Sequence, residues 1–317
     1  MLVVLTVWLA FLVIAPLHAW STVASVDTEP PGERPAGASG HTYLLVGSDS
    51  REGLSDADRS RLGTGSAEGR RTDSIILVHT PTGGGKPAMI SVPRDSYLPI
   101  PGHGRDKVNA AFAIGGPALL VETLEKATGL PIDGYVEIGF GGFASVVDSL
   151  GGVEVCVPRD IADDKAHIDL KKGCQTLDGA TALGYVRARY SDPRGDLGRA
   201  ERQRQFLGAV MKEATTPSTV LVPTRWWGFT HASAGSVLVG EDTSVVDAYR
   251  ILSTMRKASS DEALSLVVPL SSTNASTRAG SAVLWDDERA AALFTMLREG
   301  TPLDAPPAGT DGVPSGS

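Results

Sequence analysis

Residues 71–95 read RTDSIILVHTPTGGGKPAMISVPRD, and they outline the centre of a predicted β-sheet. Two apolar runs in this stretch, 74–78 and 89–92, are short and rich in Ile, Leu and Val, which predicts buried strands. The polar, Gly-rich residues 80–86 between them predict a tight turn and antiparallel pairing. A similar run at 43–47 predicts a third strand of the same sheet.

Charged residues stand directly beside these three predicted strands. If the strands are antiparallel neighbours, the end of the first, the start of the second and the end of the third share one edge of the sheet. That edge collects two carboxylates and three guanidinium groups, namely Asp49, Arg51, Arg71, Asp73 and Arg94. On these residues alone, a solvated salt-bridge cluster and a functional site both explain the pattern.

Strands and helices alternate along the following residues. The Leu spacing in 117–126 predicts a helix, and Gly129 suits its C-terminal end. Strands are expected at 135–138 and 153–157, on either side of a helix at 142–150. This alternation predicts an α/β or α+β class.

The segment 185–205, YVRARYSDPRGDLGRAERQRQ, is unusually rich in arginine. The alternation of Arg187 and Arg189 predicts a strand that places both side chains on one face. A helix is then expected from about 197 to 214, with Asp196 before it either as an N-cap or in a functional role.

On that predicted helix, Arg199 and Gln203 fall on the same stripe as Phe206, which should face the core. An anion at the start of the helix would explain buried cationic groups there, because backbone N–H groups and guanidinium groups would bind it together. Surface charge paired with neighbouring acidic residues is the alternative.

Several guanidinium groups near two aspartates suit a diphosphate with a divalent cation. Arginine binds phosphate oxygens in a bidentate manner. Mg²⁺ prefers one or two carboxylates together with phosphate oxygens and water, which matches Asp49 and Asp73. The sequence contains no P-loop, GxGxxG or GxSxG pattern, which disfavours nucleoside-triphosphate and serine-hydrolase mechanisms.

Composition excludes several other classes of protein. The 317 residues include 29 basic and 37 acidic ones, a formal net charge of −8, so a nucleic-acid partner bound by overall positive charge is not expected. Two cysteines cannot form a four-thiolate zinc site, and the six histidines show no HExxH pattern.

The N-terminal residues 2–17 are apolar, and no charged residue precedes Asp27. A signal peptide, a buried core helix and a single membrane anchor compete as explanations. The missing basic start disfavours the signal peptide, and the linker-like composition that follows disfavours the core helix. A membrane anchor over 1–26 is therefore expected, although its orientation cannot be read from flanking charges.

Two stretches of Pro and Gly bound the rest of the chain. Residues 27–40 predict a solvated linker, and residues 301–317 predict a disordered tail. One domain over 41–300 is the simplest interpretation of what lies between. If that domain is outside the membrane, Cys156 and Cys174 can form a disulfide, with two unpaired buried thiols as the alternative.

A series of motifs, in this order, resembles the LytR-CpsA-Psr (LCP) family of cell-wall polymer transferases. They are GSDSR (47–51), RTDSI (71–75), SVPRD (91–95), KVNAAF (107–112), GGVEV (151–155), LDGATALGYVRARY (177–190) and DLGRAERQ (196–203). The combination is specific, although each motif alone is weak, and it spans about 44–212.

The resemblance implies an α/β/α sandwich with a central mixed sheet flanked by helices, preceded by one N-terminal membrane helix. It implies a hydrophobic groove for a polyprenyl chain in an extracytoplasmic domain at the cell membrane. The implied reaction moves a glycopolymer from polyprenyl pyrophosphate to peptidoglycan, at a hydroxyl of N-acetylmuramic acid, with Mg²⁺. A lipid-pyrophosphate hydrolase and a non-enzymatic anionic-lipid-binding regulator are the alternatives.

The resemblance also implies roles for individual residues. Asp49 and Asp73 match metal-associated acids and, with Arg94, the catalytic group. The pyrophosphate-binding set comprises Arg71, Arg94, Arg187, Arg189, Arg199 and Gln203. Further candidates are Arg51, Lys107, Asn109, Asp196 and Arg202. Cys156 and Cys174 are similar to a disulfide of actinobacterial members of the family.

Overall fold

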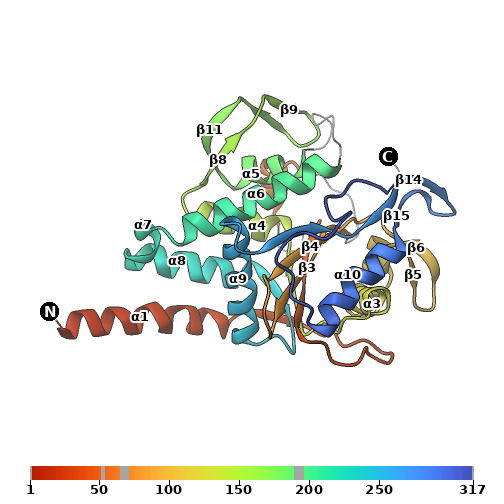
Figure 1. Ribbon diagram of the computed structural model, residues 1–317. Coiled ribbons are helices and arrows are strands. Elements are labelled where there is room, and N and C mark those ends of the chain that lie inside the picture. The colour runs from red at the N-terminus through yellow and green to blue at the C-terminus, as the bar shows by residue number, and fades with distance from the viewer. Residues whose placement is uncertain (1, 51–53, 65–70, 189–195, 316–317) are drawn as a thin grey trace. The chain divides into compact units, whose positions relative to one another are not determined.

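The computed structural model describes residues 2–50, 54–64, 71–188 and 196–315 (Figure 1). The chain forms two compact units. Unit 1 comprises three segments, 1–24, 50–67 and 138–238. Unit 2 comprises the others, 25–49, 68–137 and 239–317. Because each unit is assembled from separated segments, no linker marks the division between the units. The single domain over 41–300 stays a prediction.

A mixed seven-stranded sheet forms the centre of unit 2. Its strands, in spatial order, are β1 (Ala24–Val26), β12 (Val237–Gly240), β7 (Gly134–Ile138), β2 (Gly40–Ser48), β3 (Thr72–Pro81), β4 (Ala88–Val92) and β13 (Leu264–Val267). Strand β3 pairs antiparallel with both β2 and β4, whereas β13 pairs parallel with β4. The predicted three-strand meander and the mixed sheet are therefore confirmed.

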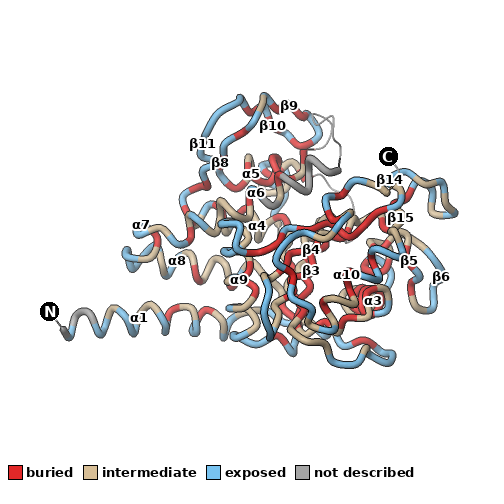
Figure 2. The backbone as a smooth tube through the Cα atoms, in the orientation of Figure 1, coloured by how far each residue is buried: buried red, intermediate tan, exposed pale blue. Residues whose placement is uncertain are grey.

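Three helices and two hairpins complete unit 2. The helices are α3 (Val108–Thr128), α9 (Val245–Ser259) and α10 (Asp287–Glu299). One hairpin pairs β5 (Tyr97–Ile100) with β6 (Gly104–Lys107), and the other pairs β14 (Leu270–Thr277) with β15 (Gly280–Trp285). Leu44, Leu77 and Ile90 of the sheet share one buried core with Leu120 of α3 and Phe294 of α10 (Figure 2). Burying these apolar side chains is the main force that holds unit 2 together.

Helix α3 is longer than the sequence predicts and is kinked. Gly115 and Gly116 have non-helical dihedral angles, with φ of 66° at Gly116, and Pro117 begins the second part. Proline disfavours a helical conformation in the residue before it, and glycine accepts the positive φ that results. Gly129, with φ of 67°, ends the helix as predicted.

The C-terminal segment, expected to be disordered, instead packs on unit 2. The backbone N–H of Val267, in the edge strand β13, donates to the carbonyl of Thr310 at 2.8 Å. The N–H of Lys86 donates to the carbonyl of Leu303 at 2.8 Å, and the Leu303 side chain is buried. Backbone groups at a sheet edge need partners, and composition alone does not show that this tail supplies them.

The predicted linker 27–40 is also attached to unit 2. Arg34 donates to Glu125 Oε1 at 2.7 Å and to the carbonyl of Ile132 at 2.6 Å. The Glu125 side chain is 1% exposed, so its charge requires a partner of opposite sign. Arg34 is that partner, and the carboxylate raises the pKa of the Arg34 guanidinium.

Unit 1 is mostly helical. Its helices are α1 (Leu2–Trp20), α2 (Asp56–Arg61), α4 (Phe140–Ser149), α5 (Gly179–Arg187), α6 (Asp196–Ala214), α7 (Pro217–Val220) and α8 (Pro223–Ala234). Its antiparallel strand pairs are β8 (Val153–Val157) with β11 (Gly173–Leu177), and β9 (Ile161–Asp163) with β10 (Ile168–Leu170). Phe140, Val147, Tyr185 and Phe206 belong to its buried core.

Helix α1 covers the apolar N-terminal stretch. Within the ranges that the structure describes, no helix reaches the length and apolarity that a membrane crossing requires. The membrane anchor over 1–26 stays a prediction.

Candidate functional site

The sheet edge predicted to collect charge does so in the structure. Beyond the last β2–β3 pair, the backbone N–H of Asp49 donates to the carbonyl of Arg71 at 2.9 Å. The N–H of Arg71 in turn donates to Asp49 Oδ1 at 2.7 Å. The Asp49 carboxylate is therefore held at the end of β2, while Arg71 is exposed.

Asp73 lies at an irregularity of the β2–β3 ladder. Gly47 is opposite Ser74, but the next residue, Ser48, is opposite Thr72, so Asp73 is the extra residue of a β-bulge. A bulge redirects the side chain of its extra residue. Here the Asp73 carboxylate accepts a hydrogen bond from Arg94 Nη1.

Arg94 follows β4 and links Asp73 to a second aspartate. Its Nε lies 3.5 Å from Asp95 Oδ2, and Lys107 Nζ lies 3.0 Å from Asp95 Oδ1. The Arg94 carbonyl accepts the N–H of Asn109 at 3.1 Å. The structure thus brings the candidates Lys107 and Asn109 to the same edge, by way of β6 and the start of α3.

Asp95 is the residue of this edge that the candidate set lacks. The signal was present, because the motif SVPRD ends in Asp95 and the motif KVNAAF begins with the opposite charge, Lys107. We call Asp49, Arg71, Asp73, Arg94, Asp95 and Lys107 the sheet-edge cluster. Its three carboxylates and three cations balance in formal charge.

The predicted strand at Arg187 is wrong. Arg187 is the last residue of α5, which begins after Asp178, whose side chain accepts the N–H of Thr181 at 2.8 Å. The consecutive residues 182–186 are all buried, so α5 is covered on more than one face, and the helix overrides the alternating pattern around Arg187. Arg189, its predicted partner, lies outside the described residues.

Arg187 packs on an aromatic ring. Its guanidinium carbon lies 4.6 Å from the centroid of the Phe140 ring, and its Nη1 donates to the carbonyl of Gly63 at 3.5 Å. Stacking of this kind uses the face of the guanidinium and fixes the orientation of its plane.

Helix α6 is tied to the end of α5 by two candidate residues. Arg202 is 4% exposed and donates to the carbonyl of Ala188. Gln203 Nε2 donates to the carbonyl of Val186 at 3.4 Å. In the structure these two side chains bind backbone and connect the helices. The side chains of Asp196 and Arg199, and all of Arg51, lie outside the described residues.

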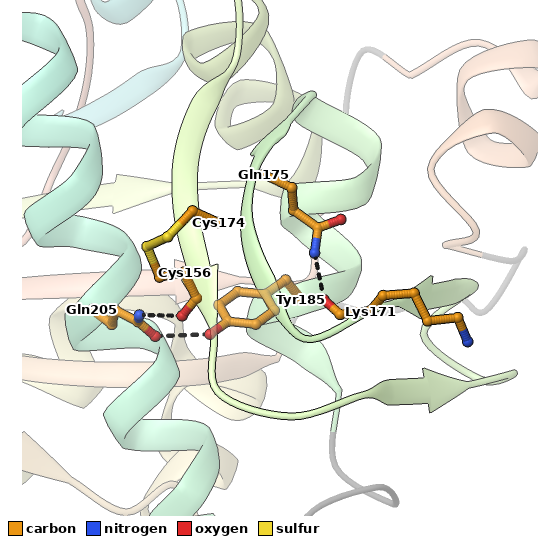
Figure 3. The surroundings of a disulfide bond; sticks show 6 residues. All are labelled: Cys156, Lys171, Cys174, Gln175, Tyr185 and Gln205. Atoms are coloured by element: carbon orange, nitrogen blue, oxygen red, sulfur yellow. Dashed lines mark hydrogen bonds between the residues drawn. A yellow bond between two sulfur atoms is a disulfide. The ribbon is translucent and has the colours of Figure 1, made fainter.

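Cys156 and Cys174 are directly opposite each other in the β8–β11 pair and form a disulfide, with their Cα atoms 3.8 Å apart (Figure 3). Gln205 of α6 joins this hairpin to α5. It accepts the Tyr185 hydroxyl at 2.8 Å and donates to the carbonyl of Cys156 at 2.9 Å. The hairpin, α5 and α6 are thereby connected by one side chain.

Among the described residues, no group of three or more His, Cys, Asp or Glu side chains is placed to hold a metal ion. Mg²⁺ in phosphate-transfer sites needs only one or two carboxylates, because phosphate oxygens and water complete its shell. Asp49 and Asp73 fit that donor set by chemistry. The sheet-edge cluster belongs to unit 2 and Arg187 and Gln203 to unit 1, so their convergence on one ligand stays a prediction.

Comparison with known proteins identifies the family. The family model described as LytR_cpsA_psr matches residues 22–266. The chain belongs to the LytR-CpsA-Psr family. It is 45% identical over 296 residues to the probable cell wall biosynthesis protein LcpB of Corynebacterium glutamicum, covering 93% of this chain and 70% of that protein.

A second LytR-CpsA-Psr relative is the polyisoprenyl-teichoic acid–peptidoglycan teichoic acid transferase TagU of Bacillus cereus. It is 42% identical over 151 residues, which cover 47% of this chain and 49% of TagU. The solved structure of TagT bound to LIIa-WTA has a TM-score of 0.60 at 26% identity and covers 86% of this chain and 97% of that chain. The family resemblance and the mixed α/β fold are confirmed, and the protein is a phosphotransferase of this cell-wall family.

Proposed function

We propose that this LytR-CpsA-Psr protein transfers a glycopolymer from a polyprenyl pyrophosphate carrier to a hydroxyl of N-acetylmuramic acid in peptidoglycan, with Mg²⁺ as its cofactor. The observation that carries the proposal is the bulge at Asp73, which directs a carboxylate to Arg94, while the backbone of Arg71, two residues earlier, holds the Asp49 carboxylate at the same sheet edge. Carboxylates and guanidinium groups side by side suit a metal–diphosphate ligand.

The sheet-edge cluster is neutral in formal charge, so it would need additional positive charge to bind a pyrophosphate. Its three carboxylates already offset its three cations. A pyrophosphate would add several negative charges to a neutral site, which is unfavourable without further cations. A divalent metal ion and the arginines of unit 1 would offset the negative charge of the pyrophosphate.

Asp49 and Asp73 would hold the metal ion. Oδ1 of Asp49 accepts the Arg71 N–H, so Oδ2 is the oxygen that this carboxylate offers to a metal or a proton. When bound, Mg²⁺ neutralises charge on the phosphate oxygens. Carboxylates near a metal–phosphate site are also the groups that accept a proton in such transfers.

In the proposed reaction, Arg71 and Arg94 bind phosphate oxygens and orient the diphosphate. The acceptor hydroxyl attacks the phosphorus attached to the sugar. A phosphorus–oxygen bond forms to the acceptor, the bond to the bridging oxygen breaks, and polyprenyl phosphate leaves. A carboxylate of the sheet-edge cluster takes the hydroxyl proton. Positioning and charge neutralisation supply most of the rate in phosphoryl transfer.

The proposal extends to the unit 1 residues of the pyrophosphate-binding set, Arg187, Arg189, Arg199 and Gln203. Arg187 supports it, because its stacking on Phe140 fixes the plane of the guanidinium, and arginine is the residue type that binds phosphate in a bidentate manner. An aromatic ring also stabilises a cation that has lost part of its water.

We further propose that the protein is attached to the cell membrane through its N-terminal segment, with the transferase units on the extracytoplasmic side. Six apolar side chains of α1 are about half exposed or more, namely Val3, Val7, Leu9, Val13, Ile14 and Leu17. Such exposure is unfavourable in water and favourable in lipid. The Cys156–Cys174 disulfide supports an oxidising compartment.

The test uses the full chain, a labelled lipid-linked donor, peptidoglycan and Mg²⁺. Wild-type protein is expected to form polymer linked to peptidoglycan. Arg94→Ala should lose about 100- to 1,000-fold of this transfer, the usual effect of removing a group that stabilises transition-state charge. Arg105→Ala is the matched control, because Arg105 is an exposed arginine of unit 2 that stacks on Tyr97.

Three results would overturn the proposal. Wild-type transfer by a folded Arg94→Ala variant would remove the role of the sheet-edge cluster. Release of free polymer without a linked product would indicate a hydrolase. Binding of the donor without any turnover would indicate a regulator.

A further inference from the structure

Helices α1 and α8 of unit 1 contact each other through aromatic side chains. The rings of Phe11 and Trp227 lie 6.3 Å apart, and those of His18 and Trp227 lie 5.5 Å apart. His18 Nδ1 is 3.1 Å from His231 Nε2. Figure 1 shows α8 beside the C-terminal part of α1. Trp227, which is partly exposed, therefore lies directly against α1.

The α7–α8 junction and α8 itself expose large apolar side chains. Leu221 is 59% exposed, Trp227 42% and Val222 39%. We define the α1–α8 apolar surface as these three residues with the six exposed apolar side chains of α1 named above. Contiguous apolar surfaces of this kind mark contact with another molecule or with lipid.

The residue types of the two helices that carry this surface fit a lipid bilayer. Four of the five tryptophans of the chain, Trp8, Trp20, Trp226 and Trp227, lie in α1 and α8. Tryptophan is enriched where protein meets the interface between lipid and water.

The charges around the surface also fit lipid. Residues 215–240 include no Asp or Glu and carry one arginine, Arg225, in a chain that has 37 acidic residues. Residues 2–26 carry no Asp, Glu, Lys or Arg. Absence of acidic groups avoids repulsion from anionic headgroups, and an exposed arginine is attracted to them.

We propose that the loop and helix ends at Leu221–Gly228 insert into the headgroup region of a lipid bilayer, next to α1, and give unit 1 a second membrane contact. The inference rests on the membrane location in the proposed function. It adds that α7 and α8, which the anchor prediction does not include, seat unit 1 on the surface that holds a lipid-linked donor.

The experiment places one environment-sensitive fluorophore on the full chain in lipid nanodiscs. Both native cysteines are in the disulfide, so Leu221→Cys adds a single thiol for labelling with a nitrobenzoxadiazole dye. The emission of this label is expected to shift to the blue on reconstitution and to be quenched by lipids that carry shallow doxyl groups. Val222→Cys serves as a second position. Ser60→Cys on α2, an exposed residue of unit 1, is the matched control and should show neither change.

The outcomes separate this inference from the proposed function. If the full chain does not enter nanodiscs, the membrane location itself fails. If it enters and the labels at 221 and 222 stay in water, the second contact is overturned while the anchor stands. If these labels leave water but doxyl lipids do not quench them, protein, such as a second copy, covers the surface, and the inference is overturned.

Discussion

His79 should make unit 2 sensitive to acid. It lies in β3, is 2% exposed, and its Nδ1 is 3.0 Å from the hydroxyl of Thr42 on β2. Burial, together with the nearby His41, lowers its pKa from 6.5 to about 4. The folded protein therefore keeps His79 neutral at pH values where the unfolded chain has already bound a proton.

The sign and size of the effect follow from linkage. Above pH 6.5, His79 is neutral in both the folded and the unfolded protein, and the full free energy of unfolding is present. As the pH falls from 6.5 to 4, the unfolded protein binds a proton first, so the free energy of unfolding decreases. With pKa values of 6.5 unfolded and about 4 folded, the loss between pH 7 and pH 4.5 is about 2 kcal/mol. Below pH 4 both states bind the proton and the loss levels off.

The assay measures the free energy of unfolding in urea at pH 7 and pH 4.5, by far-ultraviolet circular dichroism. His79→Gln is neutral at both pH values and keeps a group that can bond to Thr42, so its loss should be smaller than that of wild type by about 2 kcal/mol. The exposed His103→Gln is the control and should behave as wild type. Equal losses in wild type and His79→Gln would refute the reasoning.

Three other perturbations have defined outcomes. Arg34→Ala leaves the buried Glu125 carboxylate without its cation and should lower the free energy of unfolding by about 2 kcal/mol, below the usual 3–5 because Arg34 is 38% exposed; no change in the urea midpoint would contradict this. Reduction of the disulfide, whose cysteines are 18 residues apart, should cost about 3 kcal/mol in unit 1, and identical melting with and without reductant would show otherwise. Asp73→Asn removes one proposed metal ligand and should raise the Mg²⁺ concentration needed for half-maximal transfer, whereas an unchanged Mg²⁺ titration would exclude Asp73 as a ligand.

The strands that build the site were predictable because they are local. Runs such as 43–47 and 74–78 are apolar at consecutive positions, which is what a strand buried on both faces requires. A short turn then leaves β3 and β4 antiparallel, and the charged residues at the strand ends must meet at one edge. Asp49, Arg71 and Arg94 could be assigned to that edge without coordinates.

Arg187 shows where local patterns mislead. Arginines at alternate positions suggest a strand, but the N-cap at Asp178 and the burial of the consecutive residues 182–186 make the helix α5 more favourable. The ordered C-terminal tail is a similar case. Its composition is that of a solvated segment, yet the backbone groups of β13 bind it.

By itself, the sequence determined the family, the antiparallel meander and which charges meet at its edge, since these depend on neighbours along the chain. Only the tertiary structure decided that Asp73 is the extra residue of a bulge and that Asp95 joins Arg94 to Lys107. It alone divided the chain into two units. The physical reason is that a register shift, an ion pair and a shared core each join residues far apart in sequence, and their free energy exists only once those residues have been brought together.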